Sequence, residues 1–199
     1  MNTVEHYDNL IDENNDPVRD PEILKQHMDK WDGKQFIDAL ELSKDKDVLE
    51  IGIGTGRIAV KTAPKCAKLY GIDVSPKTIE RAKENLSLTD NVEFILDDYL
   101  EHDFSTKFDA IYSSLTLLHI ENKQAFFNKV YADLKPNGKF ILSIDDDNQD
   151  DYLDMVEYKV RVYPDNPEDT KAGILAANFK IIDIIQTEFA HIFVCKKEE

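Results

Sequence analysis

The sequence predicts an α/β fold: a mainly parallel β-sheet with helices on both faces, closed by an antiparallel hairpin at the C-terminal end. Short apolar runs typical of strands alternate with stretches whose apolar residues recur at helical spacing. That alternation is typical of a parallel sheet covered by crossover helices. Residues 179–186 and 189–195 read as two strands whose connection is too short for the crossover that a parallel pair requires, so they must be antiparallel.

The first forty-odd residues are expected to be mostly helical. Leu24, Met28 and Trp31 recur at helical spacing after Asp20-Pro21, and the pattern resumes after Asp32-Gly33. Further helical stripes follow the predicted strands, at Ile79, Ala82 and Leu86 and at Phe126, Val130 and Leu134.

The first predicted strand, residues 48–51, runs into a loop whose glycines at 52, 54 and 56 are spaced two apart. Glycine has no Cβ, so such a loop lets backbone amides approach a nucleotide-like ligand. A pyrophosphate-binding G-x-G-x-x-G pattern would need glycine at Arg57. Glu50 is unfavourable beside a pyrophosphate but favourable beside a cofactor that carries an ammonium and a sulfonium.

This stretch, VLEIGIGTGR, resembles the first motif of the class I S-adenosylmethionine-dependent methyltransferases, and the resemblance runs from about Asp47 to Ile144. It implies a Rossmann-like, doubly wound, seven-stranded sheet, mainly parallel, with an antiparallel strand in the C-terminal hairpin and a helical N-terminal segment. We therefore expect a single methyltransferase-like domain over residues 1–199. Its expected parts are a helical lid or cap (1–45), a cofactor-binding core (46–144), an acceptor-side insertion and helix (145–178) and the hairpin (179–199).

Asp73 ends the second predicted strand, 21 residues after Gly52, close to the spacing of about 20 that places a carboxylate on ribose hydroxyls. Ser75 and Pro76 then supply an N-cap and a proline at the first helical position, which puts the acid at a strand's carboxyl end. The alternative is that Asp73 only helps to cap that helix.

The third and fourth predicted strands also end in polar residues. The resemblance implies that Asp98, rather than Asp97, meets the adenine amino group, with Tyr99 beside the purine. An exposed pair of Asp residues is also often a solvated turn. Ser113, with the two residues after it, matches positions that line the methionine end and the acceptor. The residues expected to bind the cofactor are Glu50, Gly52, Gly54, Thr55, Asp73, Val74, Asp98, Tyr99 and Ser113.

His119 follows the fourth strand and is the candidate catalytic base, since an imidazole titrates near neutrality. The alternative is a histidine that anchors the start of the next helix. Asp145, at the end of the fifth strand, is a second candidate base. Tyr7 and Arg19, in the expected lid, are candidates to contact the methionine end of the cofactor.

Acidic residues crowd between Ile144 and the C-terminal hairpin. Counting from Asp146 matches several positions of a calcium-binding loop, but Asp151 stands where that loop needs glycine, so no metal site is expected. A solvated acidic loop is the simpler interpretation, and attraction of a cationic acceptor is another. Residues 158–163 alternate like an extra strand, and residues 167–177 read as a helix.

The formal net charge of −16 disfavours nucleic acid as a partner. Cys66 and Cys195 show neither a disulfide framework nor metal-ligand spacing, which favours a reducing cytoplasm. The N-terminus shows no export signal, and no apolar run approaches the length of a membrane span. We therefore expect a cytoplasmic protein without a membrane partner, while the oligomeric state is left open.

The sequence thus predicts a methyltransferase (a transferase) that uses S-adenosyl-L-methionine, releases S-adenosyl-L-homocysteine and methylates a small-molecule acceptor. A protein acceptor is left open. One alternative is an NAD(P)-dependent oxidoreductase, which Arg57, Glu50 and the closing hairpin disfavour. The other is a non-catalytic module that binds S-adenosylmethionine.

Overall fold

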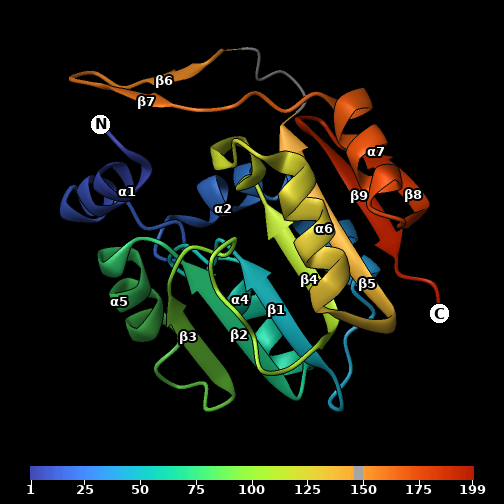
Figure 1. Ribbon diagram of the computed structural model, residues 1–199. Coiled ribbons are helices and arrows are strands. Elements are labelled where there is room, and N and C mark those ends of the chain that lie inside the picture. Colours follow the sequence, from blue (N-terminus) through green and yellow to red (C-terminus); the bar gives the residue numbers. More distant parts are fainter. Residues whose placement is uncertain (146–149) are drawn as a thin grey trace.

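The computed structural model describes residues 1–145 and 150–199, and a seven-stranded sheet forms its centre (Figure 1). The strands of this sheet are β1 (Asp47–Ile51), β2 (Lys68–Asp73), β3 (Val92–Leu96), β4 (Phe108–Ser114), β5 (Leu134–Asp145), β8 (Lys180–Gln186) and β9 (Ala190–Lys196). They lie in the order β3-β2-β1-β4-β5-β9-β8. Neighbours are parallel except at β9, which is antiparallel to both β5 and β8. The predicted mainly parallel sheet with its reversed hairpin strand is confirmed.

Helices cover both faces of the sheet. The side chains of α3, α4 and α5 pack into a core on one face, and those of α6 and α7 into a core on the other. The helices are α1 (Thr3–Asp12), α2 (Glu22–Met28), α3 (Gly33–Ala39), α4 (Ala59–Thr62), α5 (Pro76–Asn85), α6 (Lys123–Asp133) and α7 (Pro167–Ala176), with 3-10 turns η1 (Ala63–Lys65) and η2 (Leu117–His119). The predicted helical N-terminal segment is thus confirmed as α1, α2 and α3.

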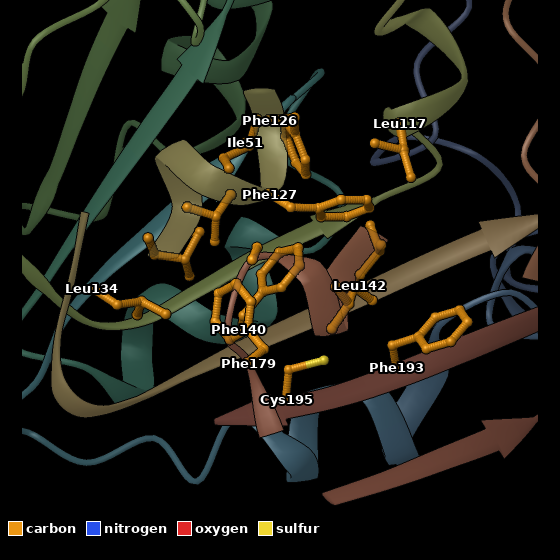
Figure 2. Close-up of a cluster of buried hydrophobic side chains, with 14 of the residues drawn as sticks. Ile51, Leu117, Phe126, Phe127, Leu134, Phe140, Leu142, Phe179, Phe193 and Cys195 are labelled. Carbon is orange, nitrogen blue, oxygen red and sulfur yellow. The ribbon is translucent and has the colours of Figure 1, made fainter. Parts of the chain in front are cut away.

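The central strands are buried on both faces, which explains why they read as continuous apolar runs. Successive residues of a strand point to opposite faces, so Leu49 joins the core under α6 and α7 while Val48 joins the other. Figure 2 shows the core under α6 and α7, in which Phe126 of α6 lies among aromatic and aliphatic side chains from the sheet. The rings of Phe140 and Phe179, both labelled there, have centroids 5.6 Å apart. Two packed layers of helices thereby hold the sheet rigid beneath its carboxyl edge.

Helix starts follow the capping chemistry of the sequence. Ser75 caps α5, because its Oγ accepts the N–H of Thr78 at 3.1 Å, and Pro76 occupies the first turn as predicted. At α1, Asn2 and Glu5 form a capping box that the sequence interpretation overlooked.

The segment before α7 contributes a small separate hairpin. The strand predicted over 158–163 is the shorter β7 (Lys159–Arg161), which pairs only with β6 (Tyr152–Asp154). The predicted helix is confirmed as α7. The calcium-loop interpretation begins at Asp146 and includes Asn148, and both of these lie outside the described residues.

The chain reverses its direction across the sheet between β1 and β4, which lie side by side. Ligands of open α/β sheets bind outside the carboxyl ends of the strands at such a reversal. Helices α1 and α2 lie beyond that end of the strands (Figure 1). None of the helices in the described part of the chain combines the length and apolar composition of a membrane span.

Candidate active site

A cavity of about 520 Å³ opens at the carboxyl edge of the sheet. Its walls come from the ends of β1, β2 and β4, from the loop after β3 and from α1. This volume falls within the range of small-molecule sites, about 300–1,000 Å³. Tyr7 and His119 line it, together with these residues predicted to bind a cofactor: Glu50, Gly52, Gly54, Thr55, Asp73, Val74, Asp98 and Tyr99.

Two glycines of the loop after β1 shape this cavity in different ways. Gly52 and Gly54 have φ angles of +75° and +56°, a conformation that residues with a Cβ rarely adopt. A Cβ at Gly52 would lie 2.2 Å from Oγ1 of Thr116, so glycine there lets the loop after β1 meet the loop after β4. A Cβ at Gly54 would meet nothing within 4 Å, so this part of the loop faces open space.

Asp73, at the end of β2, is held by two backbone donors. Its Oδ2 accepts the N–H of Gly54 at 2.9 Å, and its Oδ1 accepts the N–H of Ser75 at 3.0 Å. Burial raises the pKa of Asp73, and these N–H groups oppose that shift. The N–H of Val74 adds to these donors, and because an ionised carboxylate has about four acceptor positions, at least one stays available to a ligand hydroxyl. The capping and ligand-binding interpretations are therefore compatible.

Glu50, at the end of β1, is a buried acid on the cavity wall. Its side chain is 3% exposed, and the hydroxyl of Tyr112 donates to Oε2 at 2.8 Å. Burial raises the pKa of Glu50 to about 8. The group therefore exchanges a proton near neutral pH.

Arg57 lies on the same wall and forms a two-pronged ion pair with Asp32, which precedes α3. The N–O distances are 2.8 and 2.5 Å, and Ser114 Oγ donates to the same carboxylate at 2.6 Å. Although burial opposes it, hydrogen bonding and the charge of Arg57 hold the pKa of Asp32 below its usual value. The cavity wall thus presents an acid and a guanidinium, which suits a ligand with both an ammonium and a carboxylate.

The loop after β3 brings the predicted Asp98 and Tyr99 to the cavity, together with Asp97. Asp97 is engaged by His102, whose Nδ1 lies 2.8 Å from Oδ2, whereas the exposed Asp98 accepts the N–H of Leu100 at 2.8 Å. Tyr99 is 4% exposed, and its hydroxyl donates to Asp133 at 3.1 Å. The hydroxyl of Tyr99 is therefore held by Asp133 and points away from the cavity.

His119 and Tyr7 form another part of the lining. Tyr7 Oη and His119 Nε2 share a hydrogen bond of 2.8 Å, and their rings meet edge to face. Burial lowers the pKa of His119 to about 4, and burial raises the pKa of Tyr7. His119 Nδ1 is buried without a partner among the described residues. Both groups are neutral at pH 7.

Three candidates lie away from the cavity. Ser113 is fully buried, and its hydroxyl donates to the carbonyl of Ile51 at 3.1 Å, so it joins β4 to β1. The next two residues, Ser114 and Leu115, line the cavity instead. Arg19 pairs with Glu84 of α5 at 2.9 Å. Asp145, at the end of β5, is likewise outside the described lining.

The N-terminal segment was predicted as a lid with Tyr7 near the cofactor, but the other α1 residues of the lining and Asp32 as the partner of Arg57 were not predicted. A signal for α1 was present, because Val4, Tyr7 and Ile11 recur at helical spacing behind the capping box. No comparable pattern marks the Asp32–Arg57 pair, whose members come from different parts of the chain.

Comparison with known proteins identifies the domain. The family model described as "Methyltransferase domain" matches residues 48–138. The malonyl-acyl-carrier-protein O-methyltransferase 1 of Ilyobacter polytropus is 32% identical over 117 residues, 55% of this chain and 44% of that protein. The phosphoethanolamine N-methyltransferase of Plasmodium falciparum is 34% identical over 157 residues, 74% of this chain and 58% of that protein. The chain thus spans about half the length of these relatives.

Solved structures share the fold. An S-adenosylmethionine-dependent methyltransferase from Clostridium acetobutylicum superposes with a TM-score of 0.68 at 17% identity, covering 98% of this chain and 97% of that one. The N-methyltransferase NodS from Bradyrhizobium japonicum, in complex with S-adenosyl-L-homocysteine, gives 0.67 at 19% identity, covering 91% and 90%. At these identities the likeness concerns the fold alone. With the glycine motif and the matched domain, it leads to one conclusion: residues 48–138 form a methyltransferase domain, and the chain has the fold of the S-adenosylmethionine-dependent methyltransferases.

Proposed function

We propose that this chain binds S-adenosylmethionine and transfers its methyl group to a small-molecule acceptor. The observation that carries the proposal is the cavity at the carboxyl edge, where the glycine loop, Asp73 and Asp98 share a wall with Glu50 and Arg57. Open space in front of Gly54 and opposite charges at one end are what a nucleoside with an amino-acid tail requires.

Asp73 is the proposed ribose contact. Its carboxylate is fixed by the N–H groups of Gly54 and Ser75 before any ligand arrives, so little ordering is needed on binding. Asp98 is the proposed partner of the adenine amino group, because its side chain is exposed on the wall while Asp97 is engaged by His102. In this arrangement Tyr99 contributes apolar surface, and Thr55 and Val74 complete the wall.

Glu50 and Arg57 are proposed to hold the amino-acid end. Ionised Glu50 attracts an ammonium, and Arg57 attracts a carboxylate while it keeps its bond to Asp32. Burial strengthens both attractions, because the effective dielectric constant is lower there than in water.

When bound, S-adenosylmethionine supplies an electrophilic methyl group: the acceptor's lone pair forms the new bond to carbon, and the electrons of the breaking C–S bond stay on sulfur. The walls of the cavity align the acceptor, and positioning of this kind contributes about 7–11 kcal/mol to a two-reactant step. His119 is the proposed base. Being neutral at pH 7, it can take the acceptor's proton through the hydroxyl of Tyr7, which shares a hydrogen bond with its Nε2.

The oxidoreductase alternative gains no support from the comparisons, which name methyltransferases. Calorimetric titration of the purified chain with S-adenosylhomocysteine, and separately with NAD, tests the proposal. We expect binding of the first and not of the second. Binding of NAD alone would reject the proposal in favour of the oxidoreductase.

A matched pair of variants tests the assigned wall. Asp98→Ala should weaken S-adenosylhomocysteine binding about tenfold, the value of one hydrogen bond to a charged group, and Asp97→Ala should weaken it less. A labelled-methyl screen over small molecules and proteins then separates an enzyme from a binding module, since only the enzyme transfers label.

A further inference from the structure

The acceptor end of the cavity is apolar. Between α1 and the turn after β4, the wall is formed by aliphatic side chains around Tyr7 and the neutral His119, namely those of Val4, Ile11, Leu115 and Ile120. Leu115 directly follows Ser114, whose hydroxyl donates to Asp32 beside Arg57, so this part of the wall borders the proposed amino-acid end, and we place the acceptor there. The inference below therefore rests on the proposed function.

Among the described residues no Lys or Arg side chain lines this end, and the exposed ammonium of Met1, next to Asn2, donates to the carbonyl of Lys159 at 3.3 Å, outside the lining. Arg57 is the single Lys or Arg in the lining of the described cavity, and it is bonded to Asp32 at the amino-acid end. Lys123 lies near His119, but its Nζ donates to the carbonyl of Tyr163 at 2.8 Å and to the carboxylate of Asp165, outside the cavity.

The N-terminus of α1 is a further source of positive potential, but it is not available to an anionic ligand either. The N-terminus of α1 reaches the cavity at Asn2 and Thr3, and helix N-termini commonly bind anions. Here the capping box occupies that end: Asn2 accepts the N–H of Glu5 at 2.9 Å, and Glu5 accepts the N–H of Asn2 at 3.2 Å. The carboxylate of Glu5 places a negative charge where an anionic ligand would need a positive one.

The remaining charge of the wall is negative. Asp73, Asp97 and Asp98 line the cavity, Glu50 adds to their charge when it is ionised, and the whole chain has a net charge of −16. A phosphate or carboxylate brought into this end would lose its hydration without gaining a cation, which is costly in a buried site.

We infer that the acceptor of this chain carries no phosphate or carboxylate group, and that its nucleophile stands on a neutral or cationic small molecule with an apolar body. The relatives named for phosphoethanolamine and for malonyl-acyl-carrier protein act on acceptors that carry such anionic groups. In this inference the chain differs from these relatives in the class of acceptor.

Matched acceptor pairs test the inference. Each pair shares a nucleophile and differs by one anionic group: ethanolamine and phosphoethanolamine, tryptamine and tryptophan, thiophenol and thiosalicylate. With labelled S-adenosylmethionine, we expect kcat/KM for the member without the anionic group to exceed that of its partner by about 100-fold in any pair that reacts. An anionic member that reacts equally well or better overturns the inference.

If no member of any pair is methylated, the affinity of each member for the complex of the chain with S-adenosylhomocysteine tests the inference instead. Tighter binding of the non-anionic members supports the inference, whereas equal or tighter binding of the anionic ones, or no binding of either, overturns it. Failure of S-adenosylhomocysteine itself to bind is a different result, because it rejects the proposed function.

Two variants of Val4 test whether charge is the cause. Val4→Lys places a cation at the acceptor end, and Val4→Gln is a control of similar length without charge. Discrimination is the ratio of kcat/KM for ethanolamine to kcat/KM for phosphoethanolamine or, where neither reacts, the ratio of their affinities. We expect this ratio to be about tenfold smaller for the Lys variant than for the Gln variant. Equal discrimination by the two variants contradicts the inference.

Discussion

Tyr7 Oη and His119 Nε2 share a hydrogen bond of 2.8 Å although 112 positions separate these residues in the chain. Tyr7 belongs to α1 and His119 ends the 3-10 turn after β4, so the bond joins the N-terminal segment to the sheet across the cavity. Both side chains are neutral at pH 7, because burial lowers the pKa of His119 to about 4 and raises that of Tyr7. The pair therefore depends on the placement of α1 and not on ionic attraction.

Tyr7→Phe tests whether this bond serves catalysis. The change removes one hydroxyl and keeps the ring, so we expect the free energy of unfolding to fall by only about 1 kcal/mol. Steady-state kinetics should show kcat lowered about 100-fold, the lower end of general-base contributions, while the Kd of S-adenosylhomocysteine stays unchanged. A kcat equal to that of the parent protein would leave the pair a structural contact only.

Acid pH should destabilise the chain through His119. The folded-state pKa of about 4 lies below the ordinary value of 6.5, so the unfolded state binds the proton more readily. The stabilisation is fully present above pH 6.5 and is lost as pH falls towards 4, at most about 3 kcal/mol. Denaturant unfolding between pH 4 and 7 should show this loss, and His119→Gln should flatten that part of the profile.

Glu50 should couple cofactor binding to proton release. Its pKa of about 8 leaves it mostly protonated at pH 7, whereas a bound ammonium favours the ionised form. Affinity for S-adenosylhomocysteine should therefore rise as pH increases towards 8 and then level off. Calorimetry at pH 7 in two buffers of different ionisation enthalpy should detect the released proton. Glu50→Gln is the control, and a parent protein that releases no proton contradicts the assignment.

The fold was predictable because its signals are local. Apolar runs of strand length, helix caps such as Ser75-Pro76 and the short connection before β9 each act within a few residues of the chain. The carboxyl edge could be located for the same reason, since Gly52 directly follows β1 and Asp73 ends β2.

The wall of the site was harder to predict, because it depends on contacts between distant segments. Ser113 and Ser114 differ only in which face of β4 they occupy, and the pairing of β4 with β1 opposite Ile51 decides which of them is buried. The ion pair of Asp32 with Arg57 likewise exists only after the turn before α3 packs against the glycine loop. Spacing along a single sequence carries no information on such contacts.

Gly52 and Gly54 should respond differently to alanine. Both have positive φ, so either change costs about 1–2 kcal/mol of backbone strain. Gly52→Ala adds a collision with Thr116 and should lower the free energy of unfolding further. Gly54→Ala adds no collision, and should mainly weaken S-adenosylhomocysteine binding by placing a methyl group in the open space. Denaturant unfolding and calorimetry on both variants measure the contrast, and an equal loss of stability contradicts it.

The Asp32–Arg57 pair allows stability to be separated from cofactor binding. Asp32→Ala leaves a buried guanidinium without its partner and should cost about 3–5 kcal/mol of unfolding free energy. Replacing both residues, as Asp32→Leu with Arg57→Met, should restore most of that stability, because apolar pairs often substitute well for buried ion pairs. If Arg57 holds the cofactor's carboxylate, the double variant should still bind S-adenosylhomocysteine at least about tenfold more weakly than the parent. Recovery of both stability and affinity would show that the ion pair only supports the loop.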